Sequence, residues 1–181
     1  GEVRLSGGML RLTHGSQLGS GTKNVVIDGA TASLRLDGSA GDIEIPDSFR
    51  IFSNITADSI INEVGTNIIS GPVSLAGGSG GRRITSLAGT LILDGGLTTN
   101  TFGRTLDLRG AGNGVINGPV ANGSSVNTLS TVSKSELGTW TLNGNNSFAG
   151  GTTVNAGRLV INGSHASGAV SVAAGATLAG R

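Results

Sequence analysis

The chain has 181 residues and a formal net charge of +1, from 12 basic and 11 acidic side chains. This balance leaves no electrostatic footprint for nucleic acid or for an anionic membrane surface. The chain contains no cysteine, which excludes a disulfide scaffold and a cysteine-ligated metal site, and its 33 glycines follow no collagen-like period.

One short template recurs along the chain: two apolar residues flank a third residue, and a glycine follows within about three positions. This period-two alternation predicts short, half-buried strands whose flanking residues face a core. We predict no helix, because the nearest candidate, residues 53–64, is β-branched and polar. In chain order the predicted strands centre on Arg4, Arg11, Val26, Arg35, Glu44, Ser74, Ile92, Asp107, Thr141, Val160 and Ser171.

Internal repeats organise these predicted strands. The sequence ISGPV at residues 69–73 returns as INGPV at residues 116–120, 47 positions later. GTLILDG at residues 89–95 returns as GTWTLNG at residues 138–144, 49 positions later, and GRTL at residues 103–106 returns as GTTV at residues 151–154, 48 positions later. Repeats of one order and nearly one offset indicate a repeating architecture without a linker.

A unit of about 48 residues fits two three-sided rungs of about 24 residues, with equivalent strands stacked in parallel. We therefore predict an all-β, right-handed parallel β-helix of about eight rungs, continuous over residues 1–181 and about 35–40 Å long. Leu91 and Trp140 should occupy equivalent core positions, as should Leu93 and Leu142, and Leu142→Ala should cost about 2–5 kcal/mol. The alternative is an antiparallel β-sandwich, because Asp-Gly and Asn-Gly pairs also favour hairpins.

Residues 134–163 read KSELGTWTLNGNNSFAGGTTVNAGRLVING. This stretch resembles the passenger-associated transport repeat, also called the autotransporter-associated β-strand repeat, in its lysine, its G-T-W-T-L run, its Asn-x-Phe and its G-G-T-T-V run. Glu136 departs from the pattern, which usually has a glycine there. The best-matched repeat extends over residues 134–180. The resemblance implies a right-handed β-helix on an exported bacterial protein, at the cell surface or outside the cell.

Candidate sites are few. The two histidines, His14 and His165, are predicted in exposed loops far apart, and replacing both with alanine should leave folding nearly unchanged. Arg82 and Arg83 are predicted in a glycine-rich loop, where no aspartate completes a calcium-binding repeat. We predict no catalytic, cofactor-binding or metal-binding residue, and no cofactor. Two sets are read as structural: the acidic residues as solvated strand faces, and the corner asparagines as a stacked amide ladder. The acidic set is Asp28, Asp37, Asp42, Glu44 and Asp47, and the asparagine set is Asn113, Asn117, Asn122, Asn143 and Asn162.

The leading functional hypothesis is a non-enzymatic segment that forms a rigid stalk or fibre, with adhesive loops. The alternative is a polysaccharide-active or glycan-binding β-helix, and a face built from threonine rows ranks last because the threonines form no single regular ladder. The expected partners are neighbouring repeats of a longer chain or end-to-end stacked copies, because the sequence opens and closes within strand templates. Surface glycans or a host surface are further expected partners, whereas nucleic acid and membrane insertion are not.

Overall fold

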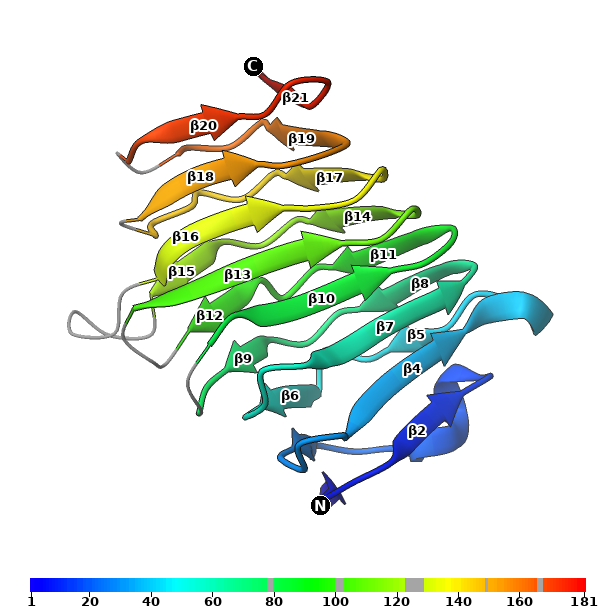
Figure 1. Cartoon of the computed structure of the whole chain (residues 1–181). Coiled ribbons are helices and arrows are strands. Elements are labelled where there is room, and N and C mark those ends of the chain that lie inside the picture. Colours follow the sequence, from blue (N-terminus) through cyan, green and yellow to red (C-terminus); the bar gives the residue numbers. More distant parts are fainter. Residues whose placement is uncertain (78–79, 100–102, 123–128, 149, 166–167) are drawn as a thin grey trace.

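The computed structural model describes residues 1–77, 80–99, 103–122, 129–148, 150–165 and 168–181 (Figure 1). In these residues the regular elements are strands and two short 3₁₀ helices, η1 (Gly15–Leu18) and η2 (Gly38–Ala40). Every strand pairing recorded among them is parallel. The prediction of parallel stacking is therefore confirmed, and residues 53–64 contain no helix: Ser53 ends one strand, Asp58–Val64 form another, and residues 54–57 connect them.

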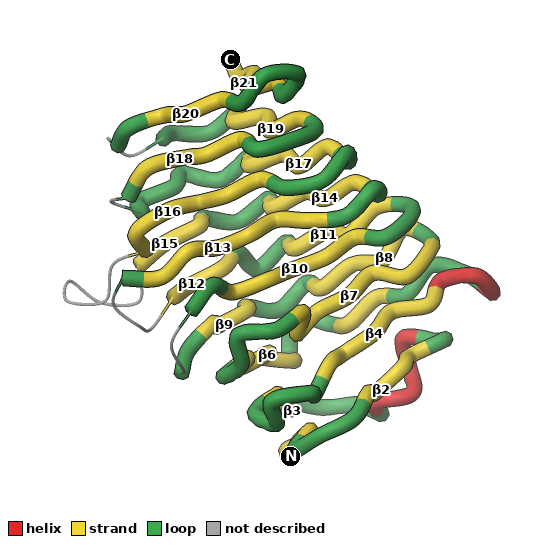
Figure 2. Tube along the Cα trace, in the orientation of Figure 1, coloured by secondary structure: helices red, strands yellow, loops and turns green. Residues whose placement is uncertain are grey.

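The strands belong to three sheets that run along the chain (Figures 1 and 2). Sheet A contains β1 (Glu2–Leu5), β3 (Lys23–Ile27), β6 (Phe49–Ser53), β9 (Val73–Leu75), β12 (Leu97–Thr99) and β15 (Val120–Asn122). Sheet B contains β2 (Met9–Leu12), β4 (Ser33–Asp37), β7 (Asp58–Val64), β10 (Arg82–Ser86), β13 (Arg104–Arg109), β16 (Leu129–Lys134), β18 (Gly151–Val154) and β20 (Val170–Val172). Sheet C contains β5 (Glu44–Ile45), β8 (Thr66–Ile69), β11 (Thr90–Leu93), β14 (Asn113–Ile116), β17 (Thr139–Leu142), β19 (Arg158–Ile161) and β21 (Thr177–Gly180).

The chain passes from sheet A to B to C in each turn, which makes a β-solenoid. Sheet A has six strands in the described residues, so about six turns include a strand on that side. Only the eight-stranded sheet B reaches the number of rungs predicted from the repeat length. The difference arises because the last turns cross the side of sheet A without a described strand.

The register confirms the repeats read from the sequence. Leu91 and Trp140 both align with Gly114, one from the preceding turn and one from the following turn, and both side chains are fully buried. Leu93 and Leu142 align in the same way with Ile116. The GRTL and GTTV pair is offset, because Leu106 aligns through Val132 with Thr152. That shift of two residues keeps the same face inward, since strand side chains alternate.

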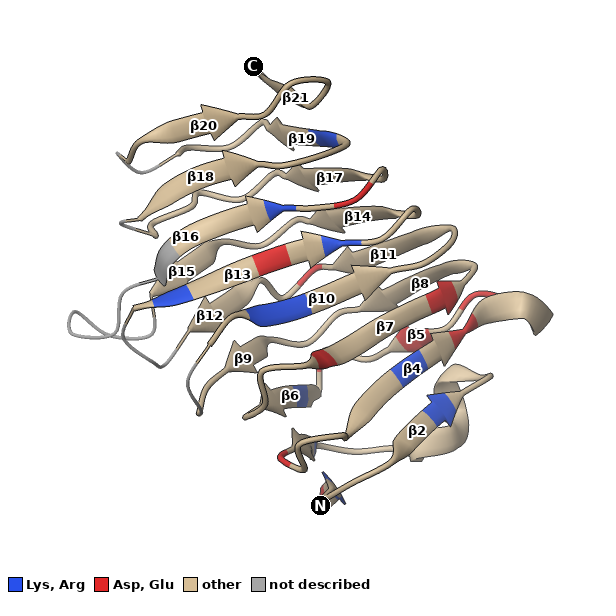
Figure 3. Ribbon diagram, in the orientation of Figure 1, with Lys and Arg blue, Asp and Glu red and all other residues tan. Residues whose placement is uncertain are grey.

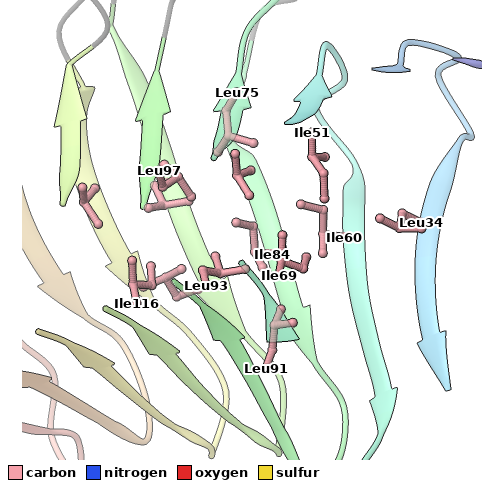
Figure 4. Close-up of a cluster of buried hydrophobic side chains, with 14 of the residues drawn as sticks. Leu34, Ile51, Ile60, Ile69, Leu75, Ile84, Leu91, Leu93, Leu97 and Ile116 are labelled. Atoms are coloured by element: carbon pink, nitrogen blue, oxygen red, sulfur yellow. The ribbon is translucent and has the colours of Figure 1, made fainter. Parts of the chain in front are cut away.

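One apolar core lies between the three sheets (Figure 4). It is built mainly from the inward-facing leucine, isoleucine and valine side chains, such as Leu34, Ile60 and Ile84 in sheet B and Ile69, Leu93 and Ile116 in sheet C. The branched aliphatic side chains suit the pleated surface of a strand. Because each layer repeats the same inward positions, the core continues from turn to turn instead of closing around a centre.

Glycines form a stacked column at the corner that follows the strands β8, β11, β14, β17 and β19 of sheet C. A Cβ atom built on Gly71 would lie 1.7 Å from the carbonyl oxygen of Phe49, and one on Gly163 would lie 1.9 Å from that of Gly144. Such approaches admit no side chain, because real Cβ atoms do not come within 3.0 Å of a neighbouring atom. The members of this column are Gly71, Gly95, Gly118, Gly144 and Gly163.

The turns become shorter toward the C-terminal strands. Ile69 aligns with Leu93, 24 positions later, whereas Leu142 aligns with Ile161, 19 positions later, and Ile161 with Gly180, again 19 positions later. The shortening coincides with the end of sheet A at β15. The solenoid therefore has two parts, wide turns with three sheets and narrow turns in which the described strands belong only to sheets B and C.

Candidate functional site

Side-chain amides form a hydrogen-bonded ladder beside the column of corner glycines. Asn117 donates from Nδ2 to Asp94 Oδ1 at 2.6 Å, Asn143 donates to Asn117 Oδ1 at 2.8 Å, and Asn162 donates to Asn143 Oδ1 at 2.9 Å. Each residue stands directly before a glycine of the column and is exposed. Each of the three asparagines donates toward the preceding turn, and Asn117 and Asn143 also accept from the following one, so the ladder has a direction.

The predicted amide ladder is confirmed for three of its five asparagines. Asn113 instead accepts a hydrogen bond from the backbone N–H of Thr139 at 3.1 Å. Asn122 donates to the carbonyl of Ser147 at 3.4 Å. Asp94 starts the ladder, a role that the pattern of asparagines did not predict. A carboxylate can only accept, so it fits the one position where no donor is needed.

The side chain of Asn146 forms hydrogen bonds with both neighbouring turns at the point where sheet A ends. In the described part of residues 143–150 no strand continues the sheet beyond β15. The buried Asn146 side chain accepts from the Val120 N–H at 3.0 Å and donates to the Ser164 carbonyl at 3.0 Å. One amide thus connects the turn before it to the turn after it, beside the backbone hydrogen bonds that link the same turns.

Lys134 lies fully buried in a column of core residues. It aligns with Leu108 in the preceding turn and with Val154 in the following turn. Its Nζ atom donates to the carbonyl oxygens of Ser135 and Glu136, both at 2.6 Å, and of Ala156 at 3.4 Å. Burial lowers the pKa of Lys134, while the negative charges of Glu136 and Asp107 oppose that shift.

Glu136 lies two residues after Lys134 in a strained conformation. Its φ of 66° is the one positive value among the described residues other than glycine. Its carboxylate lies 2.8 Å from Arg109 Nη2 and accepts from the Gly110 N–H at 3.0 Å. The departure from the repeat pattern therefore strains the backbone of one turn and ties that turn to the preceding one.

The N-terminal turns carry a cluster of charges on the outer face of sheet B (Figure 3). Glu63 bridges two arginines, with 2.5 Å to Arg11 Nε and 3.0 Å to Arg35 Nη1, and Asp37 lies 2.9 Å from Arg11 Nη2. Burial opposes the charge of Glu63, but hydrogen bonds from both arginines lower its pKa overall. Hydrogen bonds from Ser39 lower the pKa of Asp37. These charges neutralise one another across three turns.

A second polar network lies inside the corner between sheets B and C. Asn67 and Asn62 are fully buried, and Asn67 Nδ2 donates to Asn62 Oδ1 at 2.5 Å. Asn67 also accepts from the Ile43 N–H at 2.8 Å, and Asn62 donates to the Ala88 carbonyl at 2.8 Å. The network satisfies backbone groups at the corner, as buried amides require, and nothing in the strand pattern signalled it.

The two histidines lie at opposite ends of the molecule. His14 is exposed in the loop before η1, with Thr13 Oγ1 at 3.1 Å from its Nδ1. His165 is half-buried: its Nε2 lies 2.7 Å from Thr152 Oγ1, and its ring packs edge-on against Phe148 with centroids 5.3 Å apart. His14 thus occupies the exposed loop that was predicted, whereas His165 covers part of the core.

Arg82 departs from its predicted loop position. It begins β10, is 1 % exposed, and donates from Nη1 to the Ile55 carbonyl at 2.9 Å. Burial and the neighbouring charge of Arg104 lower its pKa. Arg83, next along the strand, is exposed. Period-two alternation explains the difference, since consecutive side chains of a strand point to opposite faces.

The acidic residues of the N-terminal turns do not converge. Asp28 pairs with Arg4, Asp42 accepts from the Thr66 N–H at 2.8 Å, and Glu44 accepts from Ser70 Oγ at 3.2 Å. The residues that the structure describes include no group of three or more histidine, cysteine, aspartate or glutamate side chains able to hold a metal ion. Within the same residues no helix has the length and apolar character needed to cross a membrane.

Parallel sheets wound around one continuous core define a β-solenoid. The family model described as Passenger-associated-transport-repeat matches residues 132–161, which confirms the resemblance. Comparison with curated proteins gave no match, and neither did comparison with solved structures. The matched residues contain Lys134, Trp140 and Asn146, so the repeat coincides with the transition from wide to narrow turns. The repeat and the fold fit a segment of an autotransporter passenger.

Proposed function

We propose that this chain is a rigid structural segment of an exported bacterial surface protein, which acts as a stalk or fibre and not as an enzyme. The observation that carries the proposal is the uninterrupted core, which passes through all the turns and leaves the side chains of each outer face in repeated columns. Such a solenoid is stabilised by contacts between neighbouring turns, so its length can change without a new core design.

The state of the carboxylates supports a non-enzymatic role. Hydrolysis of polysaccharides by the usual mechanism needs two carboxyl groups placed across one bond. Here Glu63 and Asp37 are engaged by arginines, Asp94 by the amide ladder, and Asp107 accepts from Ser135 Oγ at 2.7 Å. These pairings stabilise neighbouring turns.

The proposed location is the outside of the cell, where the matched repeat family is found on exported proteins. The proposed partners are other turns of a longer solenoid or further copies of the chain stacked end to end. The fold supports this proposal, because the turns of a solenoid are stabilised mainly by contacts with neighbouring turns.

A one-turn deletion tests the stalk function. Thr66 and Thr90 occupy the same position in consecutive turns, so deletion of residues 66–89 removes 24 residues and joins equivalent positions. Within the natural exported protein, this change should leave folding and display intact and bring an epitope beyond the segment closer to the cell by about one strand spacing, 4.8 Å, per deleted turn. Super-resolved distance measurements on variants lacking or duplicating several turns give the slope.

The matched control deletes residues 66–88, which shifts the register by one residue and turns apolar side chains outward. It should abolish display. A graded loss of function with length supports the stalk. Full function in chains shortened by several turns would contradict it, and release of reducing sugar from polysaccharides by the purified segment would point to the enzyme instead.

One face favours an adhesive role as a second candidate. On the outside of sheet C, Thr66 aligns with Thr90, and Ile68 and Ile92 align with Val115. The predicted threonine set is not one ladder, since Thr99 lies in sheet A, Thr139 in sheet C and Thr152 in sheet B, and Thr101 lies outside the described residues. Sedimentation with insoluble neutral polysaccharides, with and without Thr90→Lys, tests whether the sheet C columns bind.

A further inference from the structure

The corner after sheet C places two structural requirements on consecutive residues. The ladder requires an amide that both donates and accepts, and the glycine column requires a residue without a side chain. Together they place the dipeptide Asn-Gly in three successive turns, at Asn117, Asn143 and Asn162. This dipeptide is chemically labile, because no Cβ atom hinders the glycine nitrogen from approaching the asparagine side chain.

The reaction at such a site needs only water. The backbone nitrogen of the glycine attacks Cγ of the asparagine, a C–N bond forms, and the Cγ–Nδ2 bond breaks. The proton of the glycine nitrogen leaves with the side-chain nitrogen as ammonia, and a cyclic imide remains. Water then opens the imide to aspartate or isoaspartate. No oxidant, metal or enzyme takes part.

The three dipeptides differ in how the fold prepares this attack. Asn117 Oδ1 and Asn143 Oδ1 each accept a hydrogen bond from the next amide, which polarises the carbonyl carbon. Among the described residues, no acceptor engages the backbone N–H of Gly118 or Gly144, so their nitrogens are not held away by a hydrogen bond.

Asn162 lacks both features. The N–H of Gly163 donates to the Leu142 carbonyl at 3.3 Å, which occupies the attacking nitrogen. The described residues supply no donor to Asn162 Oδ1. Asn113-Gly114 is a second internal reference, because Gly114 lies within β14 under the ring of Trp140.

We infer that Asn117 and Asn143 are sites of spontaneous deamidation in the folded protein, and that Asn162 and Asn113 are protected. Conversion replaces the donor Nδ2 with an oxygen that faces the acceptor of the preceding turn. At Asn117 the new carboxylate faces Asp94, so two negative charges lie side by side. Asp94 itself escapes this conflict because it starts the ladder and only accepts.

The test is peptide mapping by mass spectrometry of the full chain, aged at mildly alkaline pH, with aspartate and isoaspartate resolved at each asparagine. In the folded chain, conversion at Asn117 and Asn143 should exceed that at Asn162 by about fivefold, the rate equivalent of one neutral hydrogen bond to the reacting group. In chain unfolded by urea the three sites should convert at similar rates. Equal rates in the folded chain, or a faster rate at Asn162, overturn the proposal.

The variant Asn162→Ala isolates the effect of the ladder, since it removes the donor to Asn143 Oδ1 at the exposed end of the array. Conversion at Asn143 should fall about fivefold while that at Asn117 stays unchanged. Asn145→Ala, an exposed neighbour outside the ladder, is the matched control and should alter neither rate. If Asn162→Ala accelerates conversion at Asn143, the ladder protects its members and the proposal fails.

Discussion

The wide turns up to β15 and the narrow turns after it reach the same architecture by different means. In the wide turns three sheets enclose the core, and side chains such as Glu63 and Arg35 link neighbouring turns outside it. From residue 137 onward the only charged side chains besides histidine are Arg158 and Arg181. There a buried amide, Asn146, and a buried aromatic ring, Phe148, lie in the segment that follows β17, where no described strand continues sheet A. A second ring, Trp140, packs over Gly114 in sheet C.

The comparison shows that a side-chain amide can supplement backbone links between turns, since the Asn146 N–H still donates to the Ser164 carbonyl at 3.2 Å and the Ser147 N–H to the Val120 carbonyl at 3.0 Å. A strand of sheet A supplies backbone hydrogen bonds to both neighbours, and Asn146 supplies one to each side from a single side chain. A narrow turn has five fewer residues than a wide turn, and its stability depends on a few individual side chains. We therefore expect single substitutions to be more damaging there than in the wide turns, where many equivalent contacts share the load.

Removal of the large ring in the transition turn should produce the largest effect. Trp140→Ala should lower the free energy of unfolding by about 3–5 kcal/mol, because it empties the space over Gly114 and leaves the Arg109 carbonyl without its indole donor. The equivalent change in the wide part, Leu91→Ala, should cost about 2–5 kcal/mol. Urea unfolding of both variants measures the difference, and a smaller loss for Trp140→Ala would remove the contrast between the two parts.

Loss of the bridging amide should come next. Asn146→Ala leaves the buried Val120 N–H without an acceptor, which costs about 1–3 kcal/mol, whereas water can reach the exposed Ser164. The neighbouring Asn145→Ala is exposed and should change stability by less than about 0.5 kcal/mol. Similar losses in the two variants, measured by thermal and urea unfolding, would contradict the bridging role.

Much of this architecture follows from residue order. Alternation and glycine punctuation predict strands such as Leu91–Leu93, and the repeat offsets predict which strands stack, because strand period and turn length are local properties. The burial of Lys134 and Arg82 does not follow. A charged side chain is buried only where backbone carbonyl groups accept its hydrogen bonds. Which carbonyl groups surround it depends on the three-dimensional path of the chain.

The narrow turns could not be predicted either. The offsets of 47 and 49 positions each span two consecutive turns before Leu142, so they carry no information about the 19-residue spacing that begins there. Similarly, the amide ladder was visible as recurring asparagines, but its donors and acceptors depend on register. The Asn-x-Phe motif was part of the family resemblance, but only the structure shows that Asn146 connects three turns.

The buried lysine gives a pH dependence to the transition turn. Because burial lowers the pKa of Lys134, the unfolded chain binds its proton more tightly, and the free energy of unfolding should rise as pH increases from the lowered pKa to about 10.5. The gain should be about 1.4 kcal/mol for each unit of the difference. Tyrosine and cysteine are absent, so the alkaline range has few other titrations. The rise should disappear in Lys134→Met. A rise that persists in this variant would show that another group causes it.

Substitution of Glu136 should have a smaller effect, because relief of backbone strain opposes the loss of contacts. Glu136→Gly relieves a positive φ that costs about 1–2 kcal/mol, but it loses the ion pair to Arg109, worth about 0–1 kcal/mol, and the hydrogen bond from the Gly110 N–H, worth about 0.5–1.5 kcal/mol. Because Glu136→Ala loses the same contacts and keeps the strain, Glu136→Gly should be the more stable of the two variants by about 1–2 kcal/mol, as judged from their unfolding midpoints. Glu136→Ala keeps the strain and loses the pair, so it should be destabilised. Destabilisation of both variants would mean that the contacts outweigh the strain.

The histidines should show the smallest effects. His14→Ala in the wide part should change the free energy of unfolding by less than about 0.5 kcal/mol. His165→Ala removes an edge-on aromatic contact with Phe148 and should cost about 0.5–1.5 kcal/mol. Unfolding of the two single variants and of the double variant separates these contributions. A larger loss of stability for His14→Ala than for His165→Ala would contradict the expectation that the narrow turns are the more sensitive part.

The glycine column also sets how the chain tolerates mutation. A substitution at Gly71 or Gly163 places a side chain inside a neighbouring backbone, so a saturation scan should find these positions almost closed. Outward positions such as Thr141 should accept most residues. A duplicated turn would thus keep its corner glycines and lose its other similarities under random substitution, so that glycine spacing outlasts every other mark of a shared ancestry between turns.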